Sequence, residues 1–423
     1  MLDLKFIVQN PDIVKKACID KHEKNNIDQI VDLNRMRKIY VAERDELRKK
    51  LNDVSAEIAK LAKSGGDIGA LKLRAGEISA QVKSVEEELR VVEENLGKLL
   101  LTVPNIPHPD VPIGDSEEDN KFIRDWGSPP EFDFEPLDHL KINEKLKIFD
   151  SRRGAKITGS FFPVFTGQGA KLVRALVYFM LDLHTSSGKY TEILPPYLVN
   201  RTSITGTAQL PKLEDDMYHL DEEDYFLIPT GEVPITNLHR GEILAEDELP
   251  KYYCGYTACF RREAGSYGKE TKGLMRLHQF DKVELVKIVH PDKSFDELED
   301  LLSDAENVLQ KLGLHYRVIL LCTADLTFGS AKTYDIELWA PGSKKWLEVS
   351  SVSNLTDFQA RRMNTRFRSK KDNKLHYVHT LNGSGVALPR LIIALLETYQ
   401  NSDGTVDIPP VLIDYFGKSK IVP

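Results

Sequence analysis

The sequence predicts an α+β protein in which an N-terminal antiparallel coiled-coil arm precedes a domain built on an antiparallel β-sheet flanked by helices. The first observation is an apolar heptad repeat that runs from residue 33 to residue 99 and is broken once by glycines. The second is a series of strand-like segments after residue 160, with helical segments between and after them. Strands in runs with helices around them are typical of α+β domains. The length of 423 residues suggests two or three domains.

The arm is predicted from two apolar ladders with a seven-residue period. They comprise Leu33, Tyr40, Leu47, Val54 and Leu61, followed by Leu71, Ile78, Val85, Val92 and Leu99. The second ladder is the cleaner one, because Glu43 and Lys50 fall at or near the alternate apolar seam of the first. Gly65-Gly66 separates the ladders and predicts a helical hairpin over about residues 30–100. Each helix would span roughly 45 Å, which is too long to lie buried against a domain of this size, so we expect a projecting arm.

A proline-rich segment marks the expected domain boundary. Residues 101–115 hold four prolines and should be extended. We therefore divide the chain into an N-terminal domain of residues 1–103 and a second domain of residues 104–423.

The first helix of the arm is basic. Residues 33–63 contain nine Lys and Arg against five acidic residues, whereas residues 70–99 contain five against six. A solvated coiled-coil flank explains such a charge run, and on charge alone it is the favoured interpretation. The functional alternative is a basic stripe that follows the phosphates of an RNA backbone. The candidate RNA-binding residues of that stripe are Arg44, Arg48, Lys49 and Lys50.

Composition excludes several classes of protein. The net charge is −8, so any contact with nucleic acid must come from a local basic face. No apolar run approaches the roughly 20 residues of a membrane span, and the N-terminus has no signal or transit pattern. We expect a cytoplasmic protein that does not enter a membrane. The four cysteines form no Cys-x-x-Cys pair, which favours core or surface thiols over metal ligands.

The elements of the second domain follow in order along the chain. We predict helices over residues 138–150, 172–184, 295–312 and 390–399, and strands over residues 161–165, 191–196, 318–323, 335–339 and 346–350. The last two strands should pair around Pro341-Gly342.

The segment of residues 260–285 predicts a long β-hairpin with a polar loop that contains three glycines. Its charged residues are expected on the flanking strands: Arg261, Arg262, Glu263, Arg276, His278, Asp281, Lys282 and Glu284. Surface charge alone could account for them. So many charges near the strand ends would be explained better by a ligand, since an Arg on a rigid strand can bind a phosphate oxygen.

The sequence FRREAGSYGKETKGLMRLHQFDKVELV resembles the motif 2 hairpin of class II aminoacyl-tRNA synthetases, in the form found in seryl-tRNA synthetases. Residues 172–196 resemble motif 1, which forms the dimer interface in that family, and residues 382–390 resemble motif 3. The heptad arm, Thr230-Gly231-Glu232 and the segment of residues 357–362 (DFQARR) extend the resemblance to nearly the whole chain.

The resemblance implies an ATP site with Mg²⁺. Arg261 would clamp the α-phosphate and Arg390 the γ-phosphate, which makes these two the catalytic residues. Glu263 would meet the adenine amino group and Phe280 would stack on the base, although Phe280 could equally be a core residue of the hairpin. The remaining ATP-binding candidates are Arg262, Glu348, Val349, Ser350 and Ser351, with Glu348 as the oxygen ligand for the metal.

The resemblance also implies a pocket for serine. Glu232 would bind the substrate ammonium group and Glu284 would accept a hydrogen bond from the serine hydroxyl. Thr230, Gly231, Asn382 and Ser384 would line the same pocket. Leu388-Pro389 departs from the commoner motif 3 pattern, in which a small residue often precedes the Arg, and this departure leaves the reach of Arg390 open.

The activity implied is that L-serine reacts with ATP to give seryl-adenylate, and the seryl group then passes to the 3′ end of tRNA(Ser), with tRNA(Sec) as a second candidate. A homodimer that binds tRNA across its subunits is implied as well. The alternatives are another class II synthetase, a synthetase-like ligase that charges a carrier protein, and a coiled-coil interaction protein whose core has lost activity. The basic arm weighs against the carrier-protein ligase, and Glu284 with Thr230 weighs against a synthetase for an apolar amino acid. A core that has lost activity is disfavoured because Arg261, Glu348 and Arg390 are all present.

Overall fold

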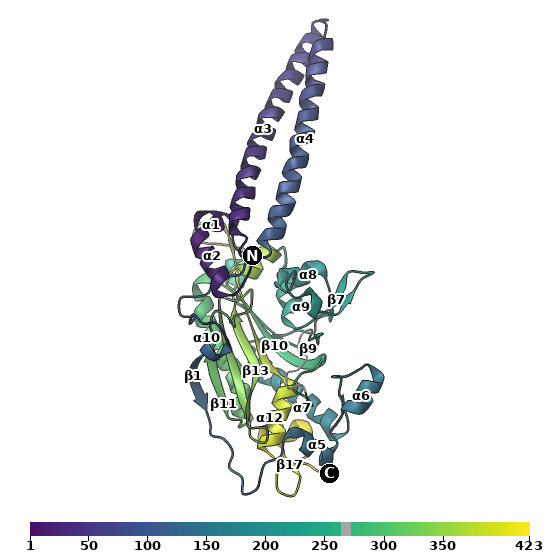
Figure 1. Cartoon of the computed structure of the whole chain (residues 1–423), viewed down its shortest axis with the longest axis vertical. Coiled ribbons are helices and arrows are strands. Elements are labelled where there is room, and N and C mark those ends of the chain that lie inside the picture. The colour runs from purple at the N-terminus through teal and green to yellow at the C-terminus, as the bar shows by residue number, and fades with distance from the viewer. Residues whose placement is uncertain (264–271) are drawn as a thin grey trace. The chain divides into compact units, whose positions relative to one another are not determined.

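The computed structural model describes residues 1–263 and 272–423 and divides the chain into two compact units. One unit is Leu2–Pro104, and the other is Asn105–Pro423 together with Met1. The predicted α+β class is confirmed, because the first unit is helical and the second is built on a largely antiparallel sheet (Figure 1).

The N-terminal unit contains the predicted helical hairpin. Two short helices, α1 (Leu4–Gln9) and α2 (Pro11–Asp20), precede the long helices α3 (Ile27–Lys63) and α4 (Gly69–Leu100). Figure 1 shows α3 and α4 side by side and joined at one tip, where Gly65 adopts a left-handed φ of 72°.

The apolar ladders explain how the two long helices pack. The buried residues of α4 recur with heptad spacing and are Ile78, Val82, Val85, Leu89, Val92 and Leu96. Along the hairpin α3 buries only Val54, since its other buried residues, Ile27, Ile30 and Asn34, lie in its first two turns. The cleaner ladder therefore belongs to the better buried helix.

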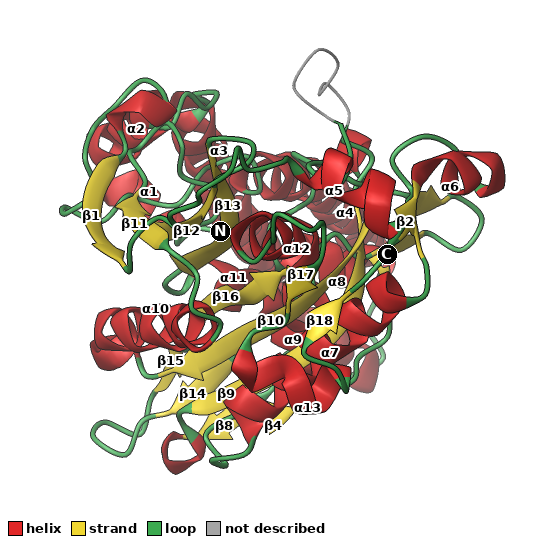
Figure 2. Ribbon diagram, turned by 90° about the horizontal axis from the view of Figure 1, so that it is seen from below, coloured by secondary structure: helices red, strands yellow, loops and turns green. Residues whose placement is uncertain are grey.

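The second unit is organised around an eight-stranded sheet with the order β1-β11-β12-β13-β16-β10-β9-β4 (Figure 2). All neighbouring strands are antiparallel except the short pair β4 and β9. The strands are β1 (Lys121–Trp126), β4 (Thr191–Glu192), β9 (Lys251–Phe260), β10 (Gln279–Val289), β11 (Tyr316–Leu320), β12 (Lys332–Ala340), β13 (Lys345–Asn354) and β16 (His379–Ala387).

Helices α7 (Gln168–Thr185), α10 (Ser294–Lys311) and α12 (Leu388–Thr398) share one apolar core with the sheet. Val283 and Leu285 of β10 belong to this core. Because side chains alternate along a strand, Lys282 and Glu284 face the opposite side of the sheet. That opposite side carries the candidate site.

Shorter elements complete the unit. The remaining α-helices are α5 (His139–Leu146), α6 (Ser151–Ile157), α8 (Arg201–Gly206), α9 (Glu232–Thr236), α11 (Phe358–Met363) and α13 (Ile413–Phe416). The remaining strands are β2 (Phe149–Asp150), β3 (Val164–Phe165), β5 (Leu198–Asn200), β6 (His219–Leu220), β7 (Tyr225–Leu227), β8 (Ile243–Ala245), β14 (Arg366–Arg368), β15 (Leu375–Tyr377), β17 (Val406–Asp407) and β18 (Lys420–Ile421). Among the described residues, no helix is long and apolar enough to cross a membrane.

The predicted hairpin is present as β9 and β10, but its charges are placed differently from the prediction. Strand pairing ends at Phe260 opposite Gln279, so five of the charged residues that were expected on the strands lie in the connection. They are Arg261, Arg262, Glu263, Arg276 and His278, and the prediction that they lie on the strands is wrong. Glu263 has a φ of 50°, which is incompatible with a continued strand. Gly265 and Gly268 of the predicted loop lie outside the described residues.

Other predicted elements are shorter than expected. The helix predicted over residues 138–150 ends at Leu146, because Lys147 adopts a left-handed conformation with a φ of 51°. The strands predicted over residues 161–165 and 191–196 retain two residues each. The pair predicted around Pro341-Gly342 is confirmed by the antiparallel register of β12 and β13.

Candidate active site

The first group of predicted residues forms a polar cluster on the face of the sheet opposite the main core. Thr230 and Gly231 follow β7, and Glu232 is the first residue of α9. Glu284 lies on β10, and the neighbouring strand β16 supplies the other two predicted residues, Asn382 and Ser384. Ser384 pairs with Glu284 in the register of the two strands, so their side chains share this face.

Glu284 is held by three partners. The Lys282 ammonium nitrogen lies 2.5 Å from Glu284 Oε2, and the Asn382 amide donates to Glu284 Oε1 at 3.1 Å. The Thr230 hydroxyl donates to Glu284 Oε2 at 3.3 Å and accepts a hydrogen bond from Lys282 at 2.7 Å. The Glu284 side chain is fully buried and that of Lys282 is 6% exposed, so both charges are compensated away from water.

Gly231 has a steric reason to lack a side chain. A Cβ at this position would lie 3.1 Å from the Glu284 Cβ and 3.2 Å from the Thr257 hydroxyl oxygen. These distances are tighter than ordinary van der Waals contact, so even alanine would force neighbouring atoms to shift. The backbone turn that carries Thr230 and Glu232 can therefore approach β10 closely.

Glu232 is buried in the same cluster. The Gln359 amide of α11 donates to Glu232 Oε1 at 2.6 Å. Burial raises the pKa of Glu232 to about 7, and the negative charge of Glu284 adds to the effect. Glu232 is thus the carboxyl group of the cluster that changes charge near neutral pH.

Sequence reasoning gave no site role to Lys282 or Gln359. For Lys282 a signal was available, since it stands two residues before Glu284 on a strand and must share its face. For Gln359 no local signal exists, because its partner Glu232 is 127 residues away in the sequence.

A second group surrounds the connection between β9 and β10. Arg261 donates from Nε to the Pro229 carbonyl at 3.2 Å, and its guanidinium carbon lies 5.3 Å from the centre of the Phe280 ring. Glu263 pairs with Arg276 at 2.8 Å. The side chain of Phe280 is half-buried. Because Pro229 directly precedes Thr230, the Arg261 contact joins this group to the polar cluster.

The other predicted ATP-binding residues lie around β13 and the start of α12. Arg390 donates to the Glu348 carbonyl at 2.8 Å and lies 3.3 Å from its carboxylate, and its Nε donates to the Met275 carbonyl at 3.3 Å. Ser350 is buried and donates to the Ser384 carbonyl at 2.6 Å, whereas Ser351 is half-buried. The Val349 side chain belongs to the main core, so only its backbone can face a ligand.

Arg262 stands apart from these groups. Its side chain is exposed, and its backbone N–H donates to the Asp216 carbonyl at 2.8 Å. No side-chain contact of Arg262 with the polar cluster or with the Arg261–Phe280 pair is present in the described part of the chain.

Two carboxyl groups are candidate ligands for a divalent cation, those of Glu348 and Asp335. The Glu348 side chain is 49% exposed, and Asp335 Oδ1 is buried without a hydrogen-bond partner. Burial raises the pKa of Asp335 well above its ordinary range, and the charge of Glu348 raises it further. In the described ranges, no group of three or more His, Cys, Asp or Glu is arranged to hold a metal. Mg²⁺ commonly uses only one or two carboxylates together with water and phosphate oxygens, so these residues fit it.

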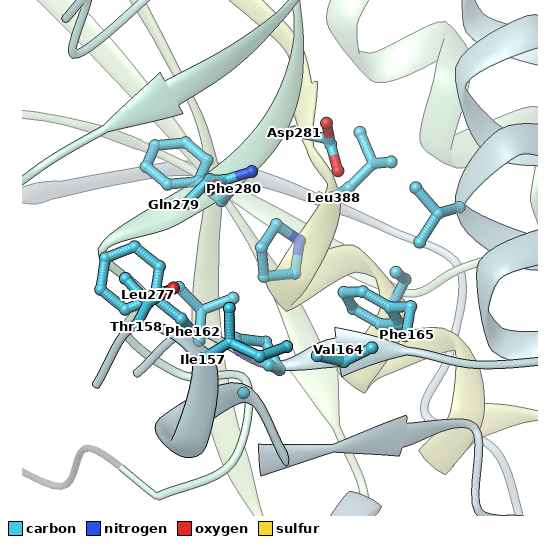
Figure 3. A pocket seen from close by; sticks show the side chains of 15 residues that line it. Ile157, Thr158, Phe162, Val164, Phe165, Leu277, Gln279, Phe280, Asp281 and Leu388 are labelled. Atoms are coloured by element: carbon cyan, nitrogen blue, oxygen red, sulfur yellow. The ribbon is translucent and has the colours of Figure 1, made fainter. Parts of the chain in front are cut away.

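A cavity of about 230 Å³ borders the second group (Figure 3). Phe280 and Asp281 of β10 line it together with Leu388 and Pro389, the two residues before Arg390. The two residues that depart from the commoner motif 3 pattern therefore line this cavity. Pro389 lies in the first turn of α12, where a missing N–H is tolerated.

The predicted tRNA-binding residues lie together on α3 of the N-terminal unit. Arg44 pairs with Asp45 at 2.7 Å, Arg48 with Glu86 at 2.5 Å and Lys50 with Glu46 at 2.7 Å. Lys49 is exposed. Their surplus positive charge is thus partly balanced within the hairpin, and solvent-exposed pairs of this kind exchange partners at little cost.

Comparison with known proteins gives the class first. Residues 212–399 match the family model described as tRNA synthetase class II core domain (G, H, P, S and T). This match agrees with the antiparallel sheet and places the chain among class II aminoacyl-tRNA synthetases. Residues 1–107 match the model described as seryl-tRNA synthetase N-terminal domain.

Individual relatives then give the family. The serine–tRNA ligase of Geobacter sulfurreducens is 52% identical over 417 residues, which cover 99% of both chains. The crystal structure of seryl-tRNA synthetase from Pyrococcus horikoshii complexed with ATP has a TM-score of 0.93, 39% identity and full coverage of both chains. The cytoplasmic serine–tRNA ligase of Naegleria fowleri in complex with AMP has a TM-score of 0.88 and 27% identity over 100% of this chain and 99% of that one. The chain belongs to the seryl-tRNA synthetase family, as its resemblance predicts.

Proposed function

We propose that this protein is a serine–tRNA ligase, which activates L-serine with ATP and transfers the seryl group to tRNA(Ser), with tRNA(Sec) as a second candidate acceptor. The observation that carries the proposal is the buried Glu284 carboxylate, held by Lys282, Thr230 and Asn382. Full-length relatives at about 50% identity are named serine–tRNA ligases, which supports the same substrate.

Serine recognition is assigned to the polar cluster. Glu284 accepts a hydrogen bond from the substrate hydroxyl, and Glu232 receives the ammonium group. A buried carboxylate left without that hydroxyl would be poorly paired, so alanine is disfavoured. The backbone at Gly231 approaches Glu284 so closely that an added Cβ would lie 3.1 Å from the Glu284 Cβ, and we assign the exclusion of the larger threonine to this close approach.

ATP binding is assigned to the second group. The relative from Pyrococcus horikoshii was solved with ATP, which supports a nucleotide site in this fold. Phe280 offers an aromatic face for adenine, and in the nucleotide complex Arg261 exchanges its contact above that ring for the α-phosphate. Glu263 receives the adenine amino group, and the backbone of residues 348–351 completes the site. Arg262 would join it only after its exposed side chain changes conformation.

Glu348, with Asp335 behind it, would hold Mg²⁺. When bound, the metal supplies charge neutralisation at the phosphates. Arg390, which now contacts Glu348, would pair with the γ-phosphate.

The reaction needs no enzymatic nucleophile. A carboxylate oxygen of serine attacks the α-phosphorus, the bond to the β-phosphate breaks, and pyrophosphate leaves. The terminal 3′-hydroxyl of tRNA then attacks the seryl carbonyl carbon, and AMP leaves with the bonding electron pair. Arg261 and Arg390 stabilise the charge that develops on the phosphates, so positioning and electrostatics supply most of the rate enhancement.

The N-terminal unit is assigned to tRNA binding. We assign residues 1–103 to this role, through Arg44, Arg48, Lys49 and Lys50, and residues 104–423 to catalysis. The basic surplus on α3 supports phosphate contacts. We further propose a cytoplasmic homodimer in which the arm of one subunit binds the tRNA whose acceptor end enters the other.

Pyrophosphate exchange tests the proposed amino-acid substrate. Purified protein is incubated with ATP, labelled pyrophosphate and one amino acid at a time. Serine should support exchange, whereas alanine, threonine and the other substrates of class II synthetases should support at least about 100-fold less. Exchange that depends equally on another amino acid would assign the protein to a different synthetase activity, and absence of exchange with every amino acid would leave only an interaction role.

A further inference from the structure

Gln359 lies behind the polar cluster and belongs to none of the motifs to which a substrate contact is assigned. It is on α11 and is 1% exposed. Its side-chain nitrogen donates to Glu232 Oε1 at 2.6 Å and to the Thr207 carbonyl at 3.1 Å. Its side-chain oxygen accepts a hydrogen bond from the Thr380 hydroxyl at 2.8 Å. Both N–H groups of the Gln359 amide and its carbonyl oxygen therefore have hydrogen-bond partners.

The partners settle the orientation of the amide. The Thr207 carbonyl can only accept a hydrogen bond, so the NH₂ group must face it. The carbonyl oxygen of Gln359 then faces Thr380, whose hydroxyl must donate. Glu232 consequently accepts at Oε1 through a short hydrogen bond typical of an ionised acceptor.

The charges around Glu232 leave it without a cation of its own. From β10, Glu284 opposes its ionisation, while Lys282 favours it but is committed to Glu284 at 2.5 Å. From the β9–β10 connection, Arg261 also favours ionisation, but it contacts Phe280 and Pro229. No ion pair to Glu232 is present within the described ranges, so Gln359 is its closest stabilising partner.

We infer that Gln359 is a positioning residue, which fixes one oxygen of Glu232 and leaves the other oriented to receive the ammonium group of the amino-acid substrate. The inference rests on the proposed function. Burial raises the pKa of Glu232 to about 7, with a further contribution from Glu284, and the Gln359 hydrogen bond opposes this rise. Without Gln359, more of Glu232 is protonated at neutral pH and cannot pair with an ammonium group.

The test is Gln359→Met, which keeps the length of the side chain and removes its hydrogen bonds. Serine-dependent pyrophosphate exchange is measured from about pH 6.5 to about pH 8.5, and each value is divided by that of the unaltered protein, which cancels the ionisation of serine itself. At neutral pH the KM for serine should rise about tenfold or more, while the KM for ATP stays within about twofold. The defect should shrink as the pH rises.

Two further variants separate the Gln359 hydrogen bonds from general changes in α11 and from unfolding. Met363→Leu, a buried and nearly isosteric change on α11, should leave the KM for serine unchanged. Should Gln359→Met not fold, Thr380→Val replaces it, because loss of the hydroxyl frees the amide to rotate and should raise the KM for serine about threefold with the same pH dependence.

A fall in kcat with unchanged KM for serine, or a defect of the same size at every pH, would overturn the inference and leave Gln359 a packing residue. These outcomes differ from failure of the proposed function, which would appear as absent serine-dependent exchange in the unaltered protein.

Discussion

Replacement of Lys282 by methionine tests the electrostatic design of the polar cluster. The change keeps the apolar stem and removes the ammonium group that lies 2.5 Å from Glu284 Oε2. Since both side chains are at most 6% exposed, Glu284 would be left buried with the Asn382 amide and the Thr230 hydroxyl alone. Removing one partner of a buried ion pair costs about 3–5 kcal/mol. We expect a loss of this order in the free energy of unfolding, measured by urea titration, and a serine kcat/KM reduced by at least about 100-fold.

Lys287→Met is the matched control. Lys287 lies on the same strand, is fully buried and pairs with Glu297 and Asp300 at 2.9 and 2.5 Å, outside the polar cluster. The carboxylates that it would leave behind are 18% and 47% exposed, and Asp300 keeps its pair with Lys189, so the stability loss should be smaller than that of Lys282→Met. Serine activation should stay within about threefold of the unaltered protein. Equal losses of serine activation in both variants would show that Lys282 acts only through stability. Near-normal activation in Lys282→Met would refute its role beside Glu284.

Four further outcomes are expected. Glu284→Ala should reduce the serine kcat/KM by at least about 100-fold, or about 2.7 kcal/mol, with little change in the KM for ATP; near-normal exchange would remove Glu284 from the pocket. Arg261→Ala should nearly abolish single-turnover adenylate synthesis without unfolding the protein, and an unchanged rate would exclude Arg261 from the reacting phosphate. Replacing residues 33–99 by a short glycine linker should preserve pyrophosphate exchange and abolish tRNA charging; full charging would make the arm a spacer. In the unaltered protein the KM for serine should increase as the pH falls through about 7, because protonated Glu232 cannot accept an ammonium group, and a flat profile would contradict this assignment.

Local periodicity explains why the arm could be predicted. The seven-residue spacing of Ile78, Val85 and Val92 is visible without knowledge of any distant residue, and the structure buries all three. The first ladder is less regular, and only Val54 of that ladder is buried. The strands β3 and β4 are shorter than predicted, since apolar residues in a short run do not reveal where the pairing partner ends.

The β9–β10 hairpin could be predicted from the sequence, but the placement of its charged residues could not. The sequence indicates the aromatic strands but does not show that their pairing ends at Phe260 and Gln279, which places Arg261 and Glu263 in the connection. The position of Lys282 beside Glu284 could have been predicted from the alternation of side chains along a strand. The contact of Gln359 with Glu232 could not, because only the fold brings α11 against Glu232. Buried polar networks between distant segments leave no local periodicity to read.

Aminoacylation of a defined tRNA shows whether this protein is a serine–tRNA ligase. Purified protein, ATP, Mg²⁺ and labelled L-serine are combined with a transcript of tRNA(Ser), and a transcript of tRNA for another class II synthetase serves as the control. Labelled serine should become acid-precipitable with tRNA(Ser) and not with the control tRNA, and AMP should form in proportion. Efficient serine-dependent exchange without any charging of tRNA(Ser), or charging of that tRNA with another amino acid, would show that the protein is not a serine–tRNA ligase.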